Sequence, residues 1–158
     1  MSRCAVTGSF DPITLGHLDV IKHARTLYDE VVVLMLINPD KQYTFGVKSR
    51  MDMINLTIAN MDGVSADYYE GITADYCKPR GITTLIRGVR DKKDLLYEKE
   101  LAGLNADFGL KTVFVDANLL HATLSSTLVR ENLDKGIYDG LPTAVVHYLK
   151  QNPDIRRK

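Results

Sequence analysis

The chain alternates between two patterns of apolar and polar positions. Short apolar stretches such as Val31–Ile37 show no alternation, which is typical of a strand that is buried on both faces of a sheet. Longer segments such as Leu18–Ala24 carry apolar residues at the spacing of a helix. Because the two kinds of segment follow one another in turn, the pattern predicts a parallel sheet covered by helices.

The predicted fold is a single α/β domain over residues 1–158, with a doubly wound, five-stranded parallel sheet and helices on both faces. We expect strands at residues 3–7, 30–37, 64–69, 83–87 and 112–116. We expect helices at residues 16–28, 47–61, 72–80, 93–108, 125–135 and 142–151. Pro79 and Gly81 should end the third helix, and Pro142 suits the first turn of the last one. The tail from Asp154 onward is expected to be solvated.

The segment Val6–His17 joins the first strand to the first helix. A turn that contains glycine at this place lets backbone N–H groups and the helix N-terminus point at the same ligand. Phosphate groups are the usual ligands of such turns. The beginning of the chain is therefore a candidate nucleotide site.

Further polar residues follow other predicted strands. Lys41 follows the second strand, Arg87 and Arg90 follow the fourth, and Ser125–Thr127 open a helix after the fifth. Ligands of open parallel sheets bind outside the carboxyl ends of the strands, so these residues should line one crevice. Three cations and a hydroxyl-rich helix N-terminus suit a substrate with several phosphates.

Each of these residues also has a simpler interpretation. Any of Ser125–Thr127 could serve only as a helix N-cap. Arg87 and Arg90 could form surface ion pairs with Asp91 or Asp94, but exposed pairs contribute little. A guanidinium fork on a phosphate is the stronger interpretation of the two arginines.

His17 follows the glycine of Thr14-Leu15-Gly16 at the start of a helix, directly after the phosphate turn. An imidazole N–H at this position could donate to a phosphoryl oxygen and stabilise the charge that grows there, without acting as a nucleophile. His23, His121 and His147 have no comparable setting.

Composition and absent motifs narrow the function further. The chain has 20 basic and 20 acidic residues, so no net charge attracts it to nucleic acid or to a membrane surface. No apolar run approaches the ~20 residues of a membrane span. Cys4 and Cys77 are far apart and read as buried free thiols, which favours a cytoplasmic protein. The chain lacks a P-loop, a Gly-x-Gly-x-x-Gly turn, a zinc-type Cys/His cluster and a Gly-x-Ser-x-Gly elbow, and we expect no protein-bound metal.

Four motifs in register resemble those of the bacterial phosphopantetheine adenylyltransferases, a family of the nucleotidyltransferase superfamily. Gly8–Pro12 with Thr14–His17 is similar to the Thr/His-x-Gly-His signature, and Ser125–Thr127 is similar to the second signature. Leu85–Arg90, followed by Tyr97-Glu98, narrows the resemblance to this family. The resemblance covers most of the chain.

The resemblance implies transfer of the adenylyl group of ATP to 4′-phosphopantetheine, giving dephospho-coenzyme A and pyrophosphate. It implies in-line attack, Mg²⁺ with the ATP, a homohexamer and coenzyme A as a feedback inhibitor. By position, the residues implied to hold phosphopantetheine are Ser9, Lys41, Thr73 and Arg87. Those implied to hold ATP are Ser9, Phe10, His17, Gly88, Val89, Arg90, Glu98, His121, Ala122, Thr123, Leu124, Ser125, Ser126 and Thr127. His17, Lys41 and Arg90 would catalyse by positioning and charge stabilisation.

The chain departs from the family pattern at several positions. Leu96 stands where an acidic residue is common, His121 where tryptophan is common, and residues 46–49 where a Ser-Leu-Glu-Glu helix start is usual. Ser9 replaces the commoner threonine and keeps its hydroxyl.

Three other functions fit part of the pattern. A nicotinate mononucleotide adenylyltransferase shares the first signature but usually lacks Arg-Gly-x-Arg with Tyr-Glu, and cytidylyltransferases match less well for the same reason. A non-catalytic nucleotide-binding module would not need His17, Lys41 and Arg90 together.

Overall fold

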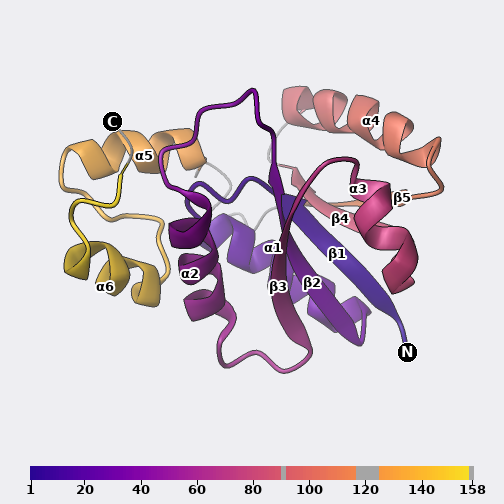
Figure 1. Cartoon of the computed structure of the whole chain (residues 1–158), viewed down its shortest axis with the longest axis horizontal. Coiled ribbons are helices and arrows are strands. Elements are labelled where there is room, and N and C mark those ends of the chain that lie inside the picture. The colour runs from indigo at the N-terminus through magenta and orange to yellow at the C-terminus, as the bar shows by residue number, and fades with distance from the viewer. Residues whose placement is uncertain (90–91, 117–124, 157–158) are drawn as a thin grey trace.

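A computed structural model describes residues 1–89, 92–116 and 125–156 of the chain. Five strands form one sheet in the order β3-β2-β1-β4-β5, and all neighbouring pairs are parallel (Figure 1). The strands are β1 (Arg3–Gly8), β2 (Glu30–Ile37), β3 (Val64–Glu70), β4 (Thr84–Val89) and β5 (Lys111–Asp116). The predicted parallel sheet is confirmed, and each predicted strand agrees with the structure to within two residues.

Six helices connect and flank the strands. They are α1 (Leu15–Leu27), α2 (Val47–Ile58), α3 (Thr73–Cys77), α4 (Lys92–Ala106), α5 (Ser126–Asp134) and α6 (Thr143–Gln151), with a 3-10 turn, η1 (Lys78–Arg80), after α3. The predicted helix over 72–80 is therefore too long as an α-helix. Pro79 lies in η1, and Gly81, at φ 69°, caps that turn in the left-handed region that glycine adopts without strain.

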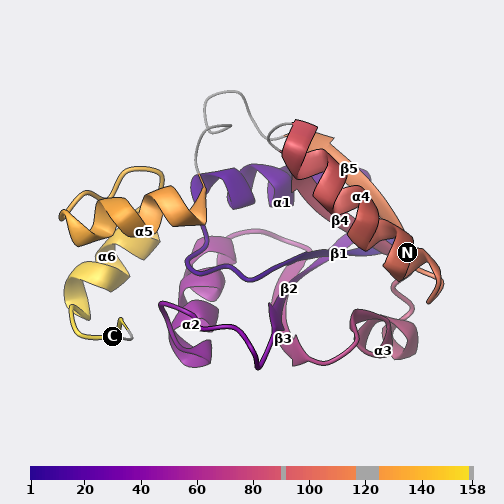
Figure 2. The same ribbon diagram turned by 90° about the horizontal axis from the view of Figure 1, so that it is seen from above.

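Two apolar clusters lie on opposite faces of the sheet, because successive side chains of a strand point to opposite faces. Val6, Val33 and Ile86 belong to the cluster that α1 and α2 cover. Ala5 and Leu85 belong to the cluster covered by α3. Figure 2 shows α1 and α3 on opposite sides of the strands, which confirms that helices cover both faces.

The two cysteines are buried free thiols, as the sequence predicts. Burial raises the pKa of Cys4 and that of Cys77 to about 11 in each case. These thiols are therefore packing groups of the core.

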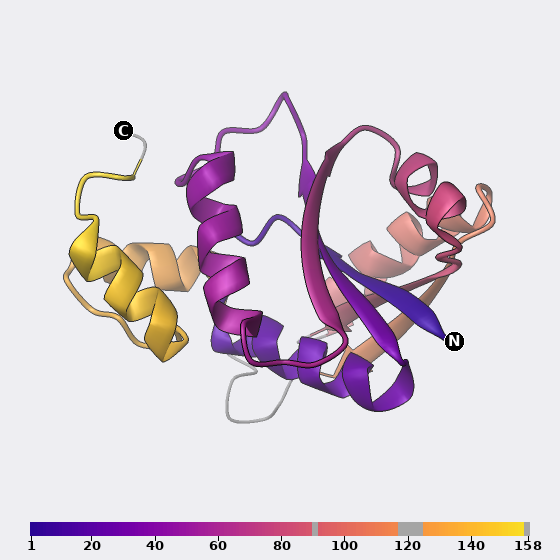
Figure 3. The same cartoon turned by 60° about the horizontal axis from the view of Figure 1, so that its bottom comes forward.

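Helices α5 and α6 lie outside the sheet and beside α2 (Figure 3). The expectation of a solvated tail is wrong as far as the structure describes it. Ile155 packs against the core, and Arg156 pairs with Asp134 and forms a backbone bridge with Phe45.

Strands β1 and β4 are neighbours in the sheet, with Val6 beside Ile86, although the chain builds β2 and β3 between them. The connection after β1 leads to the face that α1 covers, and the one before β4 comes from the face that α3 covers. A crevice opens at such a switch point, beyond the carboxyl ends of the two strands. In the described part of the chain, no helix is long and apolar enough to span a bilayer.

Candidate active site

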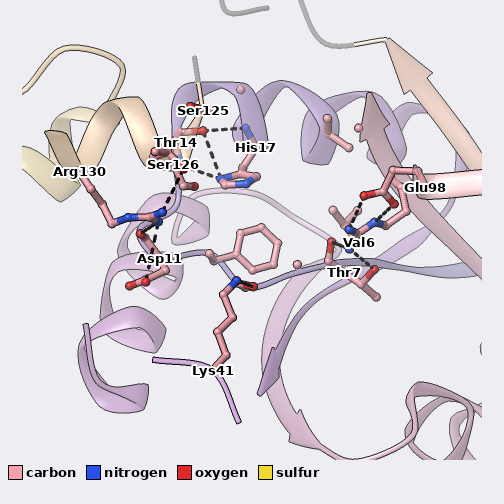
Figure 4. A pocket seen from close by; sticks show the side chains of 18 residues that line it. Val6, Thr7, Asp11, Thr14, His17, Lys41, Glu98, Ser125, Ser126 and Arg130 are labelled. Atoms are coloured by element: carbon pink, nitrogen blue, oxygen red, sulfur yellow. Dashed lines mark hydrogen bonds and ion pairs between the residues drawn. The ribbon is translucent and has the colours of Figure 1, made fainter. Parts of the chain in front are cut away.

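A cavity of about 320 Å³ opens above the carboxyl ends of β1 and β4. Ser9, Phe10, Asp11 and Thr14 of the loop after β1 line it, and Figure 4 labels Asp11 and Thr14. Phe10 is buried at positive φ and covers Gly8, where a Cβ atom would come within 3.3 Å of the phenyl ring. A larger residue at position 8 would therefore disturb the loop.

His17 is held at the start of α1 by a reciprocal capping arrangement. The backbone N–H of His17 donates to Thr14 Oγ1 at 3.3 Å, and the backbone N–H of Thr14 donates to His17 Nδ1 at 2.9 Å. Because Nδ1 accepts a hydrogen bond from this N–H, the neutral imidazole carries its own hydrogen on Nε2. The His17 ring packs edge-on against Phe10 at 4.8 Å between centroids and lines the cavity. Nε2–H is thus a hydrogen-bond donor in the fixed ring.

Asp11 fastens the loop to the rest of the molecule. Its carboxylate is buried and accepts hydrogen bonds from the backbone N–H groups of Thr44 (2.8 Å) and Phe45 (2.9 Å). Arg130 of α5 donates to the Asp11 carbonyl at 2.8 Å and lies 3.9 Å from its carboxylate. Asp11 therefore joins the loop after β1, the segment before α2 and helix α5 around the cavity.

Lys41 reaches the same loop from the segment after β2 (Figure 4), with Nζ 3.4 Å from Ser9 Oγ. Its ammonium group also lies 5.4 Å from the ring centroid of Tyr43. Arg50 stacks on that ring at 3.9 Å and donates to the Ser9 carbonyl at 3.1 Å. The tyrosine ring and the buried arginine thus hold the lysine segment against the loop.

Arg87 is held at the end of β4 by several bonds. Its Nε and Nη2 donate to the two oxygens of Glu98, each at 2.8 Å, and its Nη1 donates to Thr7 O at 2.7 Å and Thr7 Oγ1 at 3.0 Å. Glu98 of α4 is thus an ionic partner of Arg87. Asp91 and Asp94, the partners considered from the sequence, have side chains that lie outside the described part of the structure. The guanidinium orientation is fixed before any ligand arrives.

The hydroxyl-rich segment at the start of α5 both caps the helix and lines the cavity. Ser125 is the N-cap and accepts a hydrogen bond from the Leu128 N–H at 3.0 Å, and Ser126 donates to Pro12 O at 3.4 Å. Ser125, Ser126 and Thr127 all line the cavity as well. The helix N-terminus therefore faces the site with its unpaired N–H groups and its positive dipole end.

A second cavity of about 580 Å³ continues from the first. The two share a border at the end of β1 and at the charged side chains, formed by Thr7, Gly8, Ser9, Lys41, Arg87 and Glu98. Beyond this border the wall is mixed: Leu36, Leu101 and Leu104 are apolar, whereas Thr73 and Asn105 carry hydrogen-bonding groups. The site is therefore one crevice with a polar half and a longer mixed half, joined at a basic border.

The structure brings most of the predicted site residues together. Those that line the first cavity are Ser9, Phe10, His17, Lys41, Arg87, Gly88, Glu98, Ser125, Ser126 and Thr127. Thr73 lines the second cavity. Val89 is buried and lines neither cavity. Arg90 and the segment from His121 to Leu124 lie outside the described residues.

Sequence reasoning missed several residues of the site. Arg130 lies three residues after Thr127, so the helical period of α5 could have placed both on one face. Asp11, Tyr43 and Arg50 gave no local signal, because their contacts join segments that are distant in the chain.

The described residues contain no group of three or more His, Cys, Asp or Glu side chains that could hold a metal ion. The two carboxylates of the first cavity are those of Asp11 and Glu98, and both accept hydrogen bonds from the protein. This donor set does not form a cation cage.

The fold and this crevice define an α/β nucleotide-binding protein of the nucleotidyltransferase type. Residues 5–132 match the family model described as cytidylyltransferase-like. Among curated proteins, the chain is 40% identical over 132 residues to a phosphopantetheine adenylyltransferase of Streptomyces coelicolor, with 83% of each chain covered. It is 41% identical to the one of Paenarthrobacter aurescens, covering 83% of this chain and 80% of that one. It is 37% identical to the phosphopantetheine adenylyltransferase of Pseudarthrobacter chlorophenolicus, and the match covers 94% of this chain and 92% of that one. The chain belongs to the phosphopantetheine adenylyltransferase family.

Proposed function

We propose that the protein transfers the adenylyl group of ATP to 4′-phosphopantetheine, giving dephospho-coenzyme A and pyrophosphate. The observation that carries this proposal is the joined crevice, because its two halves meet at Ser9, Lys41 and Arg87. A phosphate held at this border lies between both halves. The first half suits a nucleotide triphosphate, and the second suits a long arm with alternating methylene and amide groups.

In this proposal the acceptor phosphate lies beside Lys41 and Ser9, and the α-phosphate of ATP lies beside His17. An oxygen of the acceptor attacks the α-phosphorus in line, a new P–O bond forms, and the bond to the β-phosphate breaks as pyrophosphate leaves with the electron pair. A phosphate dianion needs no general base to attack. The protein therefore contributes position and charge: His17 donates from Nε2, Lys41 supplies a cation, and the N-terminus of α5 faces the phosphates.

Mg²⁺ belongs to this proposal as part of the nucleotide substrate. Magnesium ions commonly bind through substrate phosphates and water with few protein ligands, which agrees with the absence of a carboxylate cage among the described residues. When bound to ATP, the ion would offset part of the phosphate charge.

Three further properties belong to this proposal. A homohexameric assembly and inhibition by coenzyme A rest on the family resemblance alone, and a cytoplasmic location rests on the two buried free thiols. Sedimentation velocity on the purified chain measures the first. Addition of coenzyme A to the activity assay measures the second, and localisation of the tagged chain in cells measures the third.

Pyrophosphate release tests the reaction directly. The purified protein is assayed with three substrate pairs: ATP with phosphopantetheine, CTP with phosphopantetheine, and ATP with nicotinate mononucleotide. We expect release only with ATP and phosphopantetheine together, and mass spectrometry should then detect dephospho-coenzyme A. No turnover with this pair contradicts the proposal, whereas turnover with CTP or nicotinate mononucleotide favours one of the related transferases.

A further inference from the structure

Lys41 is an exposed residue at the border of the two cavities, and two contacts hold its ammonium group there. Nζ lies 3.4 Å from Ser9 Oγ and 5.4 Å from the ring centroid of Tyr43, over the face of the ring. A lysine has a long, flexible stem, so an exposed ammonium group without such contacts samples many positions. The hydroxyl and the ring therefore decide where this cation lies.

The Tyr43 ring is itself firmly held. The residue is only 8% exposed, its hydroxyl oxygen accepts a hydrogen bond from the Asn38 N–H at 2.8 Å, and the Arg50 guanidinium stacks on the ring at 3.9 Å. The N–H of the next residue, Thr44, donates to the Asp11 carboxylate at 2.8 Å. The ring is thus a fixed surface on which the flexible lysine lies.

The segment from Asn38 to Tyr43 is a closed turn that carries the lysine. The Lys41 N–H donates to the Asn38 carbonyl at 3.1 Å, and the Asp40 N–H donates to Asn38 Oδ1 at 3.0 Å. Pro39 takes the position after Asn38 that proline favours in a β-turn. The turn therefore brings Lys41 back onto the tyrosine that follows it two residues later.

The contact between the lysine and the ring is directional. The face of an aromatic ring is negative and attracts a cation within about 6 Å of its centroid, which an aliphatic side chain of similar size does not do. Arg50, on the same ring, also donates to the Ser9 carbonyl at 3.1 Å. The ring consequently ties the ammonium group to the loop after β1.

We propose that Tyr43 is a positioning residue for Lys41, whose ammonium group it holds at the place where the charge of phosphoryl transfer develops. Tyr43 acts through the lysine and not by contact with a reacting atom. The inference rests on the proposed function, because that function gives the lysine its task. It follows that loss of the ring should matter only while the lysine is present.

The experiment measures kcat and both KM values for the wild type, Tyr43→Leu and Tyr43→Phe, and repeats Tyr43→Leu in a Lys41→Ala background. We expect Tyr43→Leu to lower kcat about tenfold, since a misplacement of part of an ångström has this effect, with KM for ATP within about twofold. Tyr43→Phe keeps the ring and should stay within about threefold of the wild type. In the Lys41→Ala background, Tyr43→Leu should change kcat less than about twofold, because no ammonium group remains to be placed.

Tyr138 supplies a matched control. Lys150 Nζ lies over its ring at 5.1 Å from the centroid, the tyrosine is partly buried, and neither residue lines either cavity. Tyr138→Leu removes the same kind of contact and should leave kcat within about twofold of the wild type. A loss of kcat equal to that of Tyr43→Leu would attribute the effect to packing and would overturn the proposal.

Two other kinetic results would also overturn it. One is an unchanged kcat in folded Tyr43→Leu, or a Tyr43→Phe variant as slow as Tyr43→Leu. The other is an undiminished effect of Tyr43→Leu in the Lys41→Ala background, which would mean that the tyrosine acts independently of the lysine. If Tyr43→Leu does not fold, Tyr43→Met fills the buried space without a ring and takes its place.

Nuclear magnetic resonance tests the contact without turnover. In the ligand-free protein, the ε-methylene protons of Lys41, assigned with Lys41→Arg, should lie upfield of their position in Tyr43→Leu because of the ring current. Equal chemical shifts would overturn the proposal. Wild-type protein that does not use phosphopantetheine would instead refute the proposed function, and the chemical shifts would still report the contact, so the two failures are distinguishable.

Discussion

A substitution at Gly88, which lines the first cavity at the end of β4, tests how closely this strand packs against α1, the helix that carries His17. A Cβ atom added at Gly88 would lie 2.7 Å from Val20 Cγ2, where carbon atoms ordinarily keep about 3.5–4.0 Å. Val20 is buried in α1, one turn after His17, and a β-branched side chain has little rotameric freedom in a helix. Gly88→Ala therefore forces the strand and the helix apart.

The magnitude follows from two opposing effects. Forcing a methyl group against the buried Val20 side chain costs about 1–3 kcal/mol, and replacing glycine by alanine recovers about 0.4–1 kcal/mol by restricting the unfolded chain. We expect the free energy of unfolding of Gly88→Ala to fall by about 1–2 kcal/mol. Because α1 carries His17, kcat should fall as well, by about tenfold for a displacement of a few tenths of an ångström.

The assay is urea unfolding followed by circular dichroism, with Gly88→Ala, Val20→Ala and the double variant compared in a cycle. Val20→Ala alone should cost about 2 kcal/mol through lost burial and the cavity it leaves. The double variant should be no less stable than Val20→Ala, because the added methyl group then occupies the vacated space. Gly103→Ala in α4 serves as the control, since a Cβ atom there meets nothing within 4 Å and should stabilise the helix by about 0.5–1 kcal/mol. Additive losses in the double variant would refute the packing argument.

Three further predictions follow from the loop and the core. His17→Ala should lower kcat about 10²-fold or more while the circular dichroism spectrum stays native, since it removes a donor to the transferred phosphoryl group; an unchanged kcat would remove that role. Asp11→Asn should lower the free energy of unfolding, measured by urea denaturation, by about 2–3 kcal/mol, because one backbone N–H bond is lost. The amide can accept only one of the two backbone N–H bonds and turns its NH₂ group toward the other N–H. Equal stability of the variant would show that these two bonds do not hold the loop. Cys4 and Cys77 should react with a thiol reagent at pH 8 only after unfolding, because both are buried and their pKa values of about 11 leave little thiolate; fast labelling of the native protein would contradict this.

The strands were predictable because burial on both faces leaves a direct signal in the sequence. The end of β4 was harder to predict, because Arg87 and Gly88 break the apolar pattern. In the structure β4 nevertheless continues to pair with β5 as far as Val89, which lies beside Asp116. Helix α2 ends three residues earlier than predicted, at Ile58, and a turn with Gly63 at φ 77° leads into β3. Apolar spacing alone could not locate either boundary, because strand pairing and turn geometry decide them.

Local signals also limited the prediction of the site. The turn, His17 and the serines of α5 were found because each belongs to a motif a few residues long. The contacts of Asp11 with Phe45 and of Arg50 with Ser9 join residues 34 and 41 positions apart. No pattern of neighbouring residues encodes such pairs, which come together only when the loop after β1 packs against α2 and the segment before it.

Arg87 shows how this difference changes a functional conclusion. In the sequence it is one of several free cations near the phosphates, and its nearest candidate partners are Asp91 and Asp94. In the fold, α4 brings Glu98 onto it from 11 positions away, and the charge is neutralised before substrate binds. Lys41, by contrast, faces the Ser9 hydroxyl and the Tyr43 ring. The lysine is therefore the stronger source of electrostatic attraction for the acceptor phosphate. The arginine, whose guanidinium is held by Glu98 and Thr7, contributes a hydrogen-bond donor of fixed orientation. Ionic strength should accordingly weaken acceptor binding mainly through Lys41, since an exposed cation is screened by salt far more than a buried pair.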